Sequence, residues 1–240
     1  MTNKNNKEAV YHERSLFGRR QGRALGKERQ KALDELLPEI GVSKDYLTLK
    51  ADQDPTHLFD KPYDEYWLEI GFGYGEHVRG LMLQNPDKAF IGAEPFVNGM
   101  TSFLKDIQEE NFPTNNLRLL MDDGMLLARS FKPVSLDGIY ILNPDPWHKT
   151  RHHKRRLVRQ ENLDIFASIL KKGGDLILTT DVEDLANWMI TETINHGAFE
   201  WQASCAADWQ TPPANWIPTR YEVKGAKGAK KMVYLLFKRM

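Results

Sequence analysis

Short apolar runs alternate with helix-like segments along most of this 240-residue chain, and this alternation limits the possible folds more than any other feature. Apolar runs bounded by turn residues predict strands, and amphipathic segments predict helices. The predicted strands cover residues 66–70, 89–94, 117–121, 136–142, 175–180, 199–205 and 231–237. The predicted helices cover residues 76–84, 96–110, 154–170 and 183–196. Such alternation is typical of an α/β fold, in which helices cover both faces of a mostly parallel sheet.

The two ends of the chain depart from this pattern. No helix is expected between the last two strands, so they most simply pair antiparallel. Near the start, Leu33, Leu36 and Leu37 have helical spacing, and Pro38 predicts the end of that helix. Residues 1 to about 13 are expected to be disordered. We therefore divide the chain into an N-terminal basic arm and helix, residues 1–60, and a main domain, residues 61–240.

The composition excludes several classes of protein. An apolar fraction of 41% with 28% charged residues is typical of a soluble globular protein. No apolar stretch approaches the roughly 20 residues of a membrane span, and the polar N-terminus lacks the apolar core of a signal peptide. Cys205 is the only cysteine, which excludes an internal disulfide. We expect a cytoplasmic protein.

The charges are unevenly distributed although the formal net charge is zero. Basic residues gather in residues 12–31, 149–159 and 224–239, where acidic residues are few or absent. Three such clusters on a neutral chain are typical of a protein that binds a polyanion. The alternative is that they are only solvated surface patches.

A glycine loop follows the first predicted strand. Gly71, Gly73 and Gly75 form the pattern G-x-G-x-G. Glycines at this point allow a tight turn and the close approach of a ligand to the backbone. The dinucleotide fingerprint would require glycine where Glu76 stands, so the pattern argues against an NAD oxidoreductase.

Acidic residues stand at successive strand ends. Glu94 ends the second strand, where a carboxylate can accept hydrogen bonds from ribose hydroxyls. Asp123 follows the third strand and could bind the amine of an adenine, a role that Asp122 could also fill. Glu69 precedes the glycines and could lie near cationic groups of a ligand.

A stiff polar segment follows the fourth strand, with the sequence Asn143-Pro144-Asp145-Pro146-Trp147-His148-Lys149. The two prolines restrict the backbone around Asp145, which favours a functional role for its carboxylate. Trp147 is read equally well as a stacking surface for a base and as an apolar cover. The histidines of this region do not have the spacing of a metal site, so no metal is predicted.

The chain resembles the bacterial tRNA (guanine-N7)-methyltransferases. The resemblance is carried by residues 68–75, the segment from Pro144 to Lys149, the late Thr219-Arg220-Tyr221-Glu222 and the basic stretch at residues 17–23. It covers residues from about 14 to 239. One departure is Ile-Leu-Asn before Pro144, where an aromatic residue was expected.

The resemblance implies the fold, the activity and the roles of particular residues. The fold would be that of the class I S-adenosylmethionine-dependent methyltransferases, Rossmann-like, with seven strands and an antiparallel last strand. The activity would be methyl transfer from S-adenosylmethionine to N7 of guanosine 46 in the variable loop of tRNA. Cofactor contacts would come from Glu69, Gly71, Gly73, Glu94, Asp123 and Asp145. Substrate contacts would come from Lys149, Asp181, Thr219, Arg220, Tyr221 and Glu222.

Guanine N7 has a lone pair in the neutral base, so the reaction needs alignment and electrostatic stabilisation more than a general base. Asp145 is the candidate catalytic residue, and Asp181 is the second choice. The backbone of tRNA would be held by Arg19, Arg20, Arg23, Arg151, Arg155 and Arg156. The N-terminal arm is expected to be disordered before tRNA binds, and residues 225–228 are expected to form a mobile loop.

Two further functions stay open at this point. A methyltransferase for small molecules would leave the basic clusters unused. A non-catalytic RNA-binding protein would leave the acidic residues unexplained. We expect a monomer with no obligate protein partner.

Overall fold

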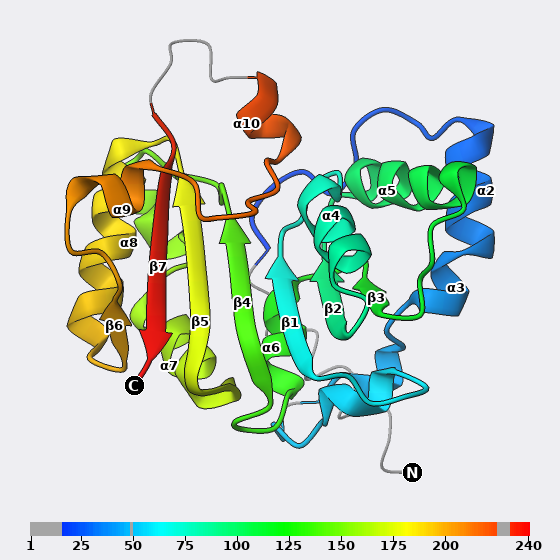
Figure 1. The fold of residues 1–240 in the computed structure, drawn as a ribbon. Helices are drawn as coiled ribbons and strands as arrows, with labels where there is room; N and C mark the ends of the chain where they lie inside the picture. The colour runs from blue at the N-terminus through cyan, green and yellow to red at the C-terminus, as the bar shows by residue number, and fades with distance from the viewer. Residues whose placement is uncertain (1–15, 49, 225–230) are drawn as a thin grey trace.

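A seven-stranded sheet with the order β3-β2-β1-β4-β5-β7-β6 runs through the protein (Figure 1). The structure is a computed structural model that describes residues 16–48, 50–224 and 231–240. The strands are β1 Glu65–Ile70, β2 Lys88–Ala93, β3 Leu117–Leu120, β4 Leu136–Leu142, β5 Leu170–Thr180, β6 Phe199–Trp201 and β7 Val233–Arg239. β1 to β5 pair parallel, and β7 pairs antiparallel with both β5 and β6. The predicted sheet, with its antiparallel last strand, is confirmed.

Helices cover both faces of the sheet, as expected. The α-helices are α2 Lys27–Glu35, α3 Leu37–Ile40, α4 Glu76–Gln84, α5 Val97–Glu110, α6 Gly124–Ser130, α7 Gln160–Ile169, α8 Glu183–His196, α9 Ala206–Gln210 and α10 Arg220–Lys224. The 3-10 helices are η1 Lys44–Tyr46, η2 Pro55–Leu58 and η3 Thr150–Arg155. One face carries α4 and α5, with α2 packed outside α5, and the other face carries α6, α7 and α8 (Figure 1).

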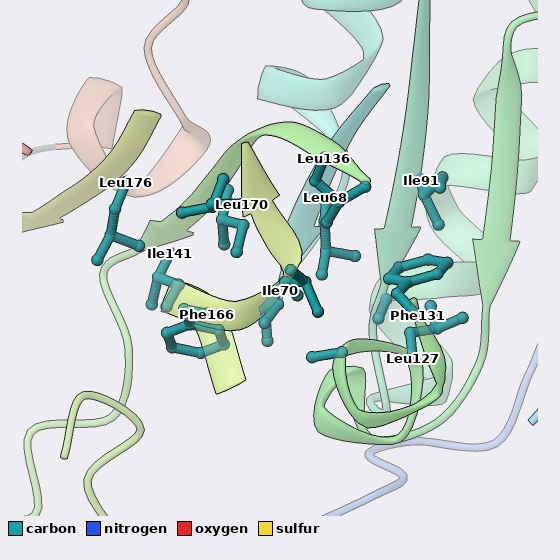
Figure 2. Close-up of a cluster of buried hydrophobic side chains, with 14 of the residues drawn as sticks. Leu68, Ile70, Ile91, Leu127, Phe131, Leu136, Ile141, Phe166, Leu170 and Leu176 are labelled. Carbon is teal, nitrogen blue, oxygen red and sulfur yellow. The ribbon is translucent and has the colours of Figure 1, made fainter. Parts of the chain in front are cut away.

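Each face of the sheet has its own apolar core. The larger core joins β1, β2, β4 and β5 to α6 and α7, and Figure 2 shows residues such as Leu68, Ile141 and Phe166 converging there. The smaller core lies under α2, α4 and α5 and includes Phe90 and Phe103. Strands buried on both faces consist almost entirely of apolar residues, because each side chain meets a helix layer.

The prediction for residues 154–170 is wrong. Residues 150–155 form η3, residues 156–159 are not helical, and α7 begins only at Gln160. β5 in turn begins at Leu170 and runs through Gly173, which has a φ of +78°. The glycine pair therefore lies within the strand and does not mark the end of a helix.

The prediction that no helix separates the last two strands is also wrong. β6 ends at Trp201. α9 begins at Ala206, where the side chain of Asp208 accepts hydrogen bonds from the backbone of Ser204 and Cys205. α10 follows before β7. α6 was not predicted at all: it is short and buried almost all round, so it shows no amphipathic period.

The N-terminal helix divides at the proline. α2 ends at Glu35, and Pro38 lies in the first turn of α3, where its missing N–H costs nothing. The chain then pairs with the edge of the sheet, because the N–H of Val42 donates to the carbonyl of Leu119 at 2.8 Å. The boundary near residue 60 stays a prediction. The expectations for residues 1–13 and 225–228 lie outside the described residues.

The glycine loop generates a prediction about stability. Gly75 has a φ of +85°, and a Cβ there would lie 2.4 Å from Cγ of Phe103. Gly197 has a φ of +75° with no atom within 4 Å of such a Cβ. Gly75→Ala should therefore cost about 3 kcal/mol, from backbone strain and overpacking together, and Gly197→Ala only about 1 kcal/mol, from strain alone. Urea unfolding of both variants measures this, and equal losses would contradict the proposed clash with Phe103.

Candidate functional site

A pocket of about 490 Å3 opens at the carboxyl ends of the parallel strands. This edge is where ligands bind in open α/β sheets. Its walls include Gly71 after β1, Glu94 after β2, Asp123 before α6 and Asp145 after β4. The structure thus brings together four of the residues expected to bind the cofactor.

Glu94 is a buried carboxylate that organises the turns around it. It is 6% exposed and accepts hydrogen bonds from the backbone N–H groups of Gly73 at 2.7 Å and Phe96 at 2.8 Å. Burial raises the pKa of Glu94 to about 7, against the effect of these two N–H donors, and the charges of Glu69 and Asp145 raise it further. Glu94 and the acids near it therefore favour a cationic group of a ligand, and the same pocket is also lined by Arg19, Arg20, Arg155, Arg156 and Arg159.

Asp123 caps the N-terminus of α6, because its side chain accepts a hydrogen bond from the N–H of Met125 at 3.0 Å. Its neighbour Asp122 accepts from the N–H of Asp123 and lies 3.9 Å from the guanidinium of Arg20. Of the two acids only Asp123 is among the residues that line the pocket. This supports Asp123, although the choice between these neighbours stays a prediction.

Glu69 and Gly73 are not among the residues that line this pocket. Glu69 is 3% exposed, and its carboxylate lies 2.9 Å from Nδ1 of His77. The buried ring of His77 in turn packs against Tyr140 and Trp216, with centroids 4.7 and 4.9 Å apart. Sequence reasoning missed His77, since no motif spacing connects it to Glu69. The cofactor role of Glu69 stays a prediction.

The loop after β4 holds Asp145 at the pocket. Asn143 and Trp147 on either side of the Pro-Asp-Pro segment have φ values of 49° and 46°, in the left-handed region that residues other than glycine rarely adopt. Asp145 is exposed, yet the surrounding protein withdraws enough water to raise the pKa of its carboxyl group. The structure places this carboxylate in the pocket at the strand edge, and its rigid placement stays a prediction.

The N-terminal arm lies across the pocket from residue 16 onward. The carbonyl of Arg20 accepts from the N–H of Val97 at 2.9 Å, and Asn98 bonds the backbone of both Gly22 and Arg23. The ring of Phe17 meets that of Trp147 edge to face at 6.2 Å. Residues 17–23 are exposed, as expected of a segment with little to bury, and their backbone is held by hydrogen bonds to α5. Whether the arm is ordered before tRNA binds stays a prediction.

Trp147 acts as a cover in this structure. Its ring lies against Phe17 and under the guanidinium of Arg155, which is 4.9 Å from the ring centroid. Arg155 also lies 5.0 Å from the ring of Phe17. The three side chains form one wall of the pocket, so of the two readings of Trp147 the contacts favour the apolar cover.

Asp181 and residues 219–222, which are expected to bind substrate, lie together near the glycine loop. Glu222 accepts hydrogen bonds from the backbone and hydroxyl of Thr219, at 3.1 and 3.0 Å, and from Trp216 and Tyr234. Tyr221 donates to Asp181 at 3.2 Å. Glu222 therefore holds the shape of this segment, and the substrate roles of these residues stay predictions.

Arg220 connects the same segment to the glycine loop. Its Nε lies 2.8 Å from Oε1 of Glu76, and its guanidinium lies 4.6 Å from the ring centroid of Tyr74. Lys149 is exposed just before η3. The structure thus brings Asp181, Thr219, Arg220, Tyr221 and Glu222 together, whereas the place of Lys149 beside them stays a prediction.

A second hollow of about 570 Å3 lies between the arm, α2 and α5, with Arg220 in its wall. Its cationic residues outnumber its acids: Arg23, Lys27, Arg29, Lys105 and Arg220 against Glu28 and Asp106. We call it the basic groove. It places part of the first basic cluster beside the predicted substrate segment.

Arg156, Lys238 and Arg239, which belong to the predicted basic clusters, lie elsewhere. Arg156 is 1% exposed and cannot reach a phosphate backbone, so its predicted role is wrong. At the end of β7, Lys238 pairs with Asp175 at 2.8 Å and Arg239 donates to the carbonyl of Ala167. Because β7 runs antiparallel, these two residues lie at the edge opposite the pocket.

Neither a metal centre nor a membrane segment is found in the described part of the chain. There, no group of three or more His, Cys, Asp or Glu side chains is arranged to hold a metal ion. No described helix combines the length and apolar character that crossing a bilayer requires.

The strand order, with a pocket at the carboxyl ends of the parallel strands, is that of the class I S-adenosylmethionine-dependent methyltransferase fold. Residues 64–235 match a family model described as "Putative methyltransferase". Among solved structures, a 16S rRNA methyltransferase, KamB, aligns with a TM-score of 0.53 and 16% identity over 74% of this chain and 88% of that one. An antibiotic-related methyltransferase gives 0.52 and 18% over 74% and 89%. At these identities the likeness shows the fold alone.

Curated relatives are much more similar. The tRNA (guanine-N(7)-)-methyltransferase of Rhizobium meliloti (strain 1021) is 43% identical over 226 residues, which are 94% of this chain and 95% of that protein. The protein of the same name from Brucella melitensis biotype 1 is 39% identical over 223 residues, 93% of this chain and 94% of its own. This chain belongs to the tRNA (guanine-N(7)-)-methyltransferase family.

The raised pKa of Glu94 generates a prediction about pH and stability. A carboxyl group with a higher pKa in the folded than in the unfolded protein contributes stability that is present below about pH 4.5 and lost as the pH rises through about 7. Glu94→Gln cannot ionise. Between pH 5 and pH 8 this variant should therefore lose less folding free energy than the wild type, by on the order of 3 kcal/mol.

Urea unfolding at both pH values measures the difference. Glu110→Gln, which changes an exposed carboxylate at the end of α5, is the control and should keep the wild-type pH dependence. An unchanged slope in Glu94→Gln would show that Glu94 ionises normally in the folded protein.

Proposed function

We propose that this protein transfers the methyl group of S-adenosylmethionine to N7 of a guanosine in tRNA, at position 46 of the variable loop, and so forms 7-methylguanosine. Family membership supports the reaction, since relatives about 40% identical over almost their whole length bear this name. The pocket at the strand ends supports the class of chemistry.

The residues of the pocket fit the cofactor. S-adenosylmethionine carries cationic ammonium and sulfonium groups and two ribose hydroxyls, and Glu94, Asp123 and Asp145 offer carboxylates to them. No atom lies within 4 Å of where a Cβ of Gly71 would be, so a ligand can approach the backbone. A volume of about 490 Å3 suits a molecule of this size. When bound, the cofactor supplies an activated methyl group.

Asp145 carries this proposal, because it combines a stiff loop, a place in the pocket and a carboxylate. Neutral guanine needs no proton removed from N7 before attack, so a base is not required. As positive charge develops on the purine, a nearby carboxylate gains interaction energy, and that gain lowers the barrier. Asp181, held by Tyr221, is the second candidate for this role.

The substrate would be held beside the pocket. Lys149, Asp181, Thr219, Arg220, Tyr221 and Glu222 would bind the guanosine nucleotide. The basic groove, which shares Arg220 with this set, would hold the tRNA backbone. All of these groups belong to one chain, which supports the proposal that the protein acts as a monomer. A tRNA substrate supports the proposal that the protein is cytoplasmic.

The first test is methyl transfer from labelled S-adenosylmethionine to unmodified tRNA, followed by digestion to nucleosides. Wild-type protein should give labelled 7-methylguanosine, and a tRNA with adenosine at position 46 should take none. Asp145→Asn keeps the shape but removes the charge, so kcat should fall about 100-fold while the Kd for tRNA changes less than about threefold.

Asp164→Asn is the matched control for this test, since Asp164 is exposed on α7 and pairs with His196. It should leave kcat unchanged. Label in another nucleoside would contradict the assigned target atom. Equal losses of kcat and of tRNA affinity in Asp145→Asn would contradict the electrostatic role.

The basic groove predicts a salt effect. Arg23 and Lys27 are exposed in it, and each phosphate contact contributes close to one unit to the slope of log Kobs against log salt concentration. The double variant Arg23→Gln, Lys27→Gln should lower this slope by about one to two, measured by filter binding between low and moderate salt. Lys172→Gln, at the start of β5 and the opposite edge of the sheet, should not alter it. A slope equal to that of the wild type would exclude the groove from the tRNA interface.

A further inference from the structure

Arg156 is a charged side chain in the interior. It is 1% exposed and is the largest of the fully buried side chains. A guanidinium in the interior is unfavourable unless it is hydrogen-bonded and paired. Arg156 has no role in the proposed reaction, so we examine which parts of the structure its guanidinium contacts.

Three contacts surround the guanidinium. Its Nε–H donates to the carbonyl of Pro146 at 2.9 Å, and its Nη2 pairs with the carboxylate of Asp184 at the start of α8. The guanidinium lies over the ring of Trp188, 4.9 Å from its centroid. Trp188 also donates from Nε1 to the carbonyl of Val158 at 2.7 Å. Arg156 is thus fixed from α8 and reaches the loop after β4.

The acceptor is the residue directly after Asp145. This loop places two residues other than glycine, Asn143 and Trp147, at positive φ. Such a backbone persists only when its surroundings hold it. At its start, the N–H of Asn143 donates to the carbonyl of Thr179 at 3.0 Å. Beyond Asp145, the hydrogen bond from Arg156 to the carbonyl of Pro146 holds the next peptide of the loop.

We propose that Arg156 is a positioning residue that, through the carbonyl of Pro146, holds the Asp145 loop so that the Asp145 carboxylate stays at the pocket. The kinetic part of this proposal depends on the proposed function, whereas the holding of the loop does not. Asp184 and Trp188 fix the guanidinium in the orientation in which one nitrogen faces Pro146. A second nitrogen, Nη1, has no hydrogen-bond partner within the described part of the chain, and Arg156 lines the pocket.

The direct test is amide hydrogen exchange of the full-length protein, followed by mass spectrometry of peptides that cover residues 143–149. Arg156→Met keeps the length of the side chain and removes its donors. Exchange in this segment should become at least tenfold faster. In the methyl-transfer assay kcat should fall roughly 10- to 30-fold, while the KM for S-adenosylmethionine and the Kd for tRNA change less than about threefold.

Arg118→Met is the matched control. Arg118 is another largely buried arginine, 4.8 Å from the ring centroid of Phe59 and remote from the pocket. It should lower the melting temperature without changing exchange in residues 143–149 or kcat. A melting temperature reduced in Arg156→Met, with wild-type exchange in this segment and wild-type kcat, would overturn the proposal.

Arg156→Lys covers the case in which Arg156→Met does not fold. It keeps the charge, but one ammonium group cannot bond both Pro146 and Asp184 with the geometry of the planar fork. Faster exchange in residues 143–149 in a folded Arg156→Lys protein supports the proposal, and wild-type exchange overturns it. If the wild type transfers no methyl group to tRNA, the proposed function fails, and hydrogen exchange still decides whether Arg156 holds the loop.

Discussion

The parallel register of β1, β2, β3 and β4 is the constraint on which the site depends. β1 pairs with β2 up to the match of Ile70 with Ala93, and β2 pairs with β3 up to the match of Ala93 with Leu120. The ladder continues one step past the strands, since the N–H of Gly71 donates to Ala93 and that of Glu94 to Leu120. The strands therefore end at one level, and the residues that follow them face a common pocket.

This constraint explains why much of the fold could be predicted. Buried parallel strands are nearly continuous apolar runs, so β1 to β4 were found close to their true bounds, and α8 was found with both ends correct. The failures have local causes. Gln160 and not Lys154 begins α7, and Arg156, in the non-helical stretch before it, turns inward to bond the carbonyl of Pro146. α2 ends close to Pro38 as expected, but the short α3 that Pro38 opens was not predicted. The sequence alone does not show whether a proline ends one helix or begins the next, or whether a basic residue is buried or exposed.

In the candidate site, too, some residues could be predicted from the sequence and others could not. Glu94, Asp123 and Asp145 could be placed, because the ends of parallel strands meet and each acid stands within three residues of a strand end. The partners of these acids could not be placed. His77 meets Glu69, and Asn98 meets the arm, through contacts between segments that no motif relates. Arg156 is the clearest case, since within a run of basic residues nothing in the sequence separates a buried cation from its solvated neighbours.

The electrostatics of the pocket follow from this packing. The carboxylates of Glu69 and Asp145 are near enough to Glu94 for their charges to raise its pKa. Without a ligand, the repulsion among these three carboxylates therefore disfavours their ionised forms. A positive charge in the pocket offsets this repulsion and favours the ionised form of Glu94. Methyl transfer removes the sulfonium charge and leaves the ammonium group on the product, so the acids lose only part of their interaction with the ligand. The acids therefore distinguish the donor from its product only through the sulfonium charge, and the ammonium group, which both carry, keeps its interaction with them.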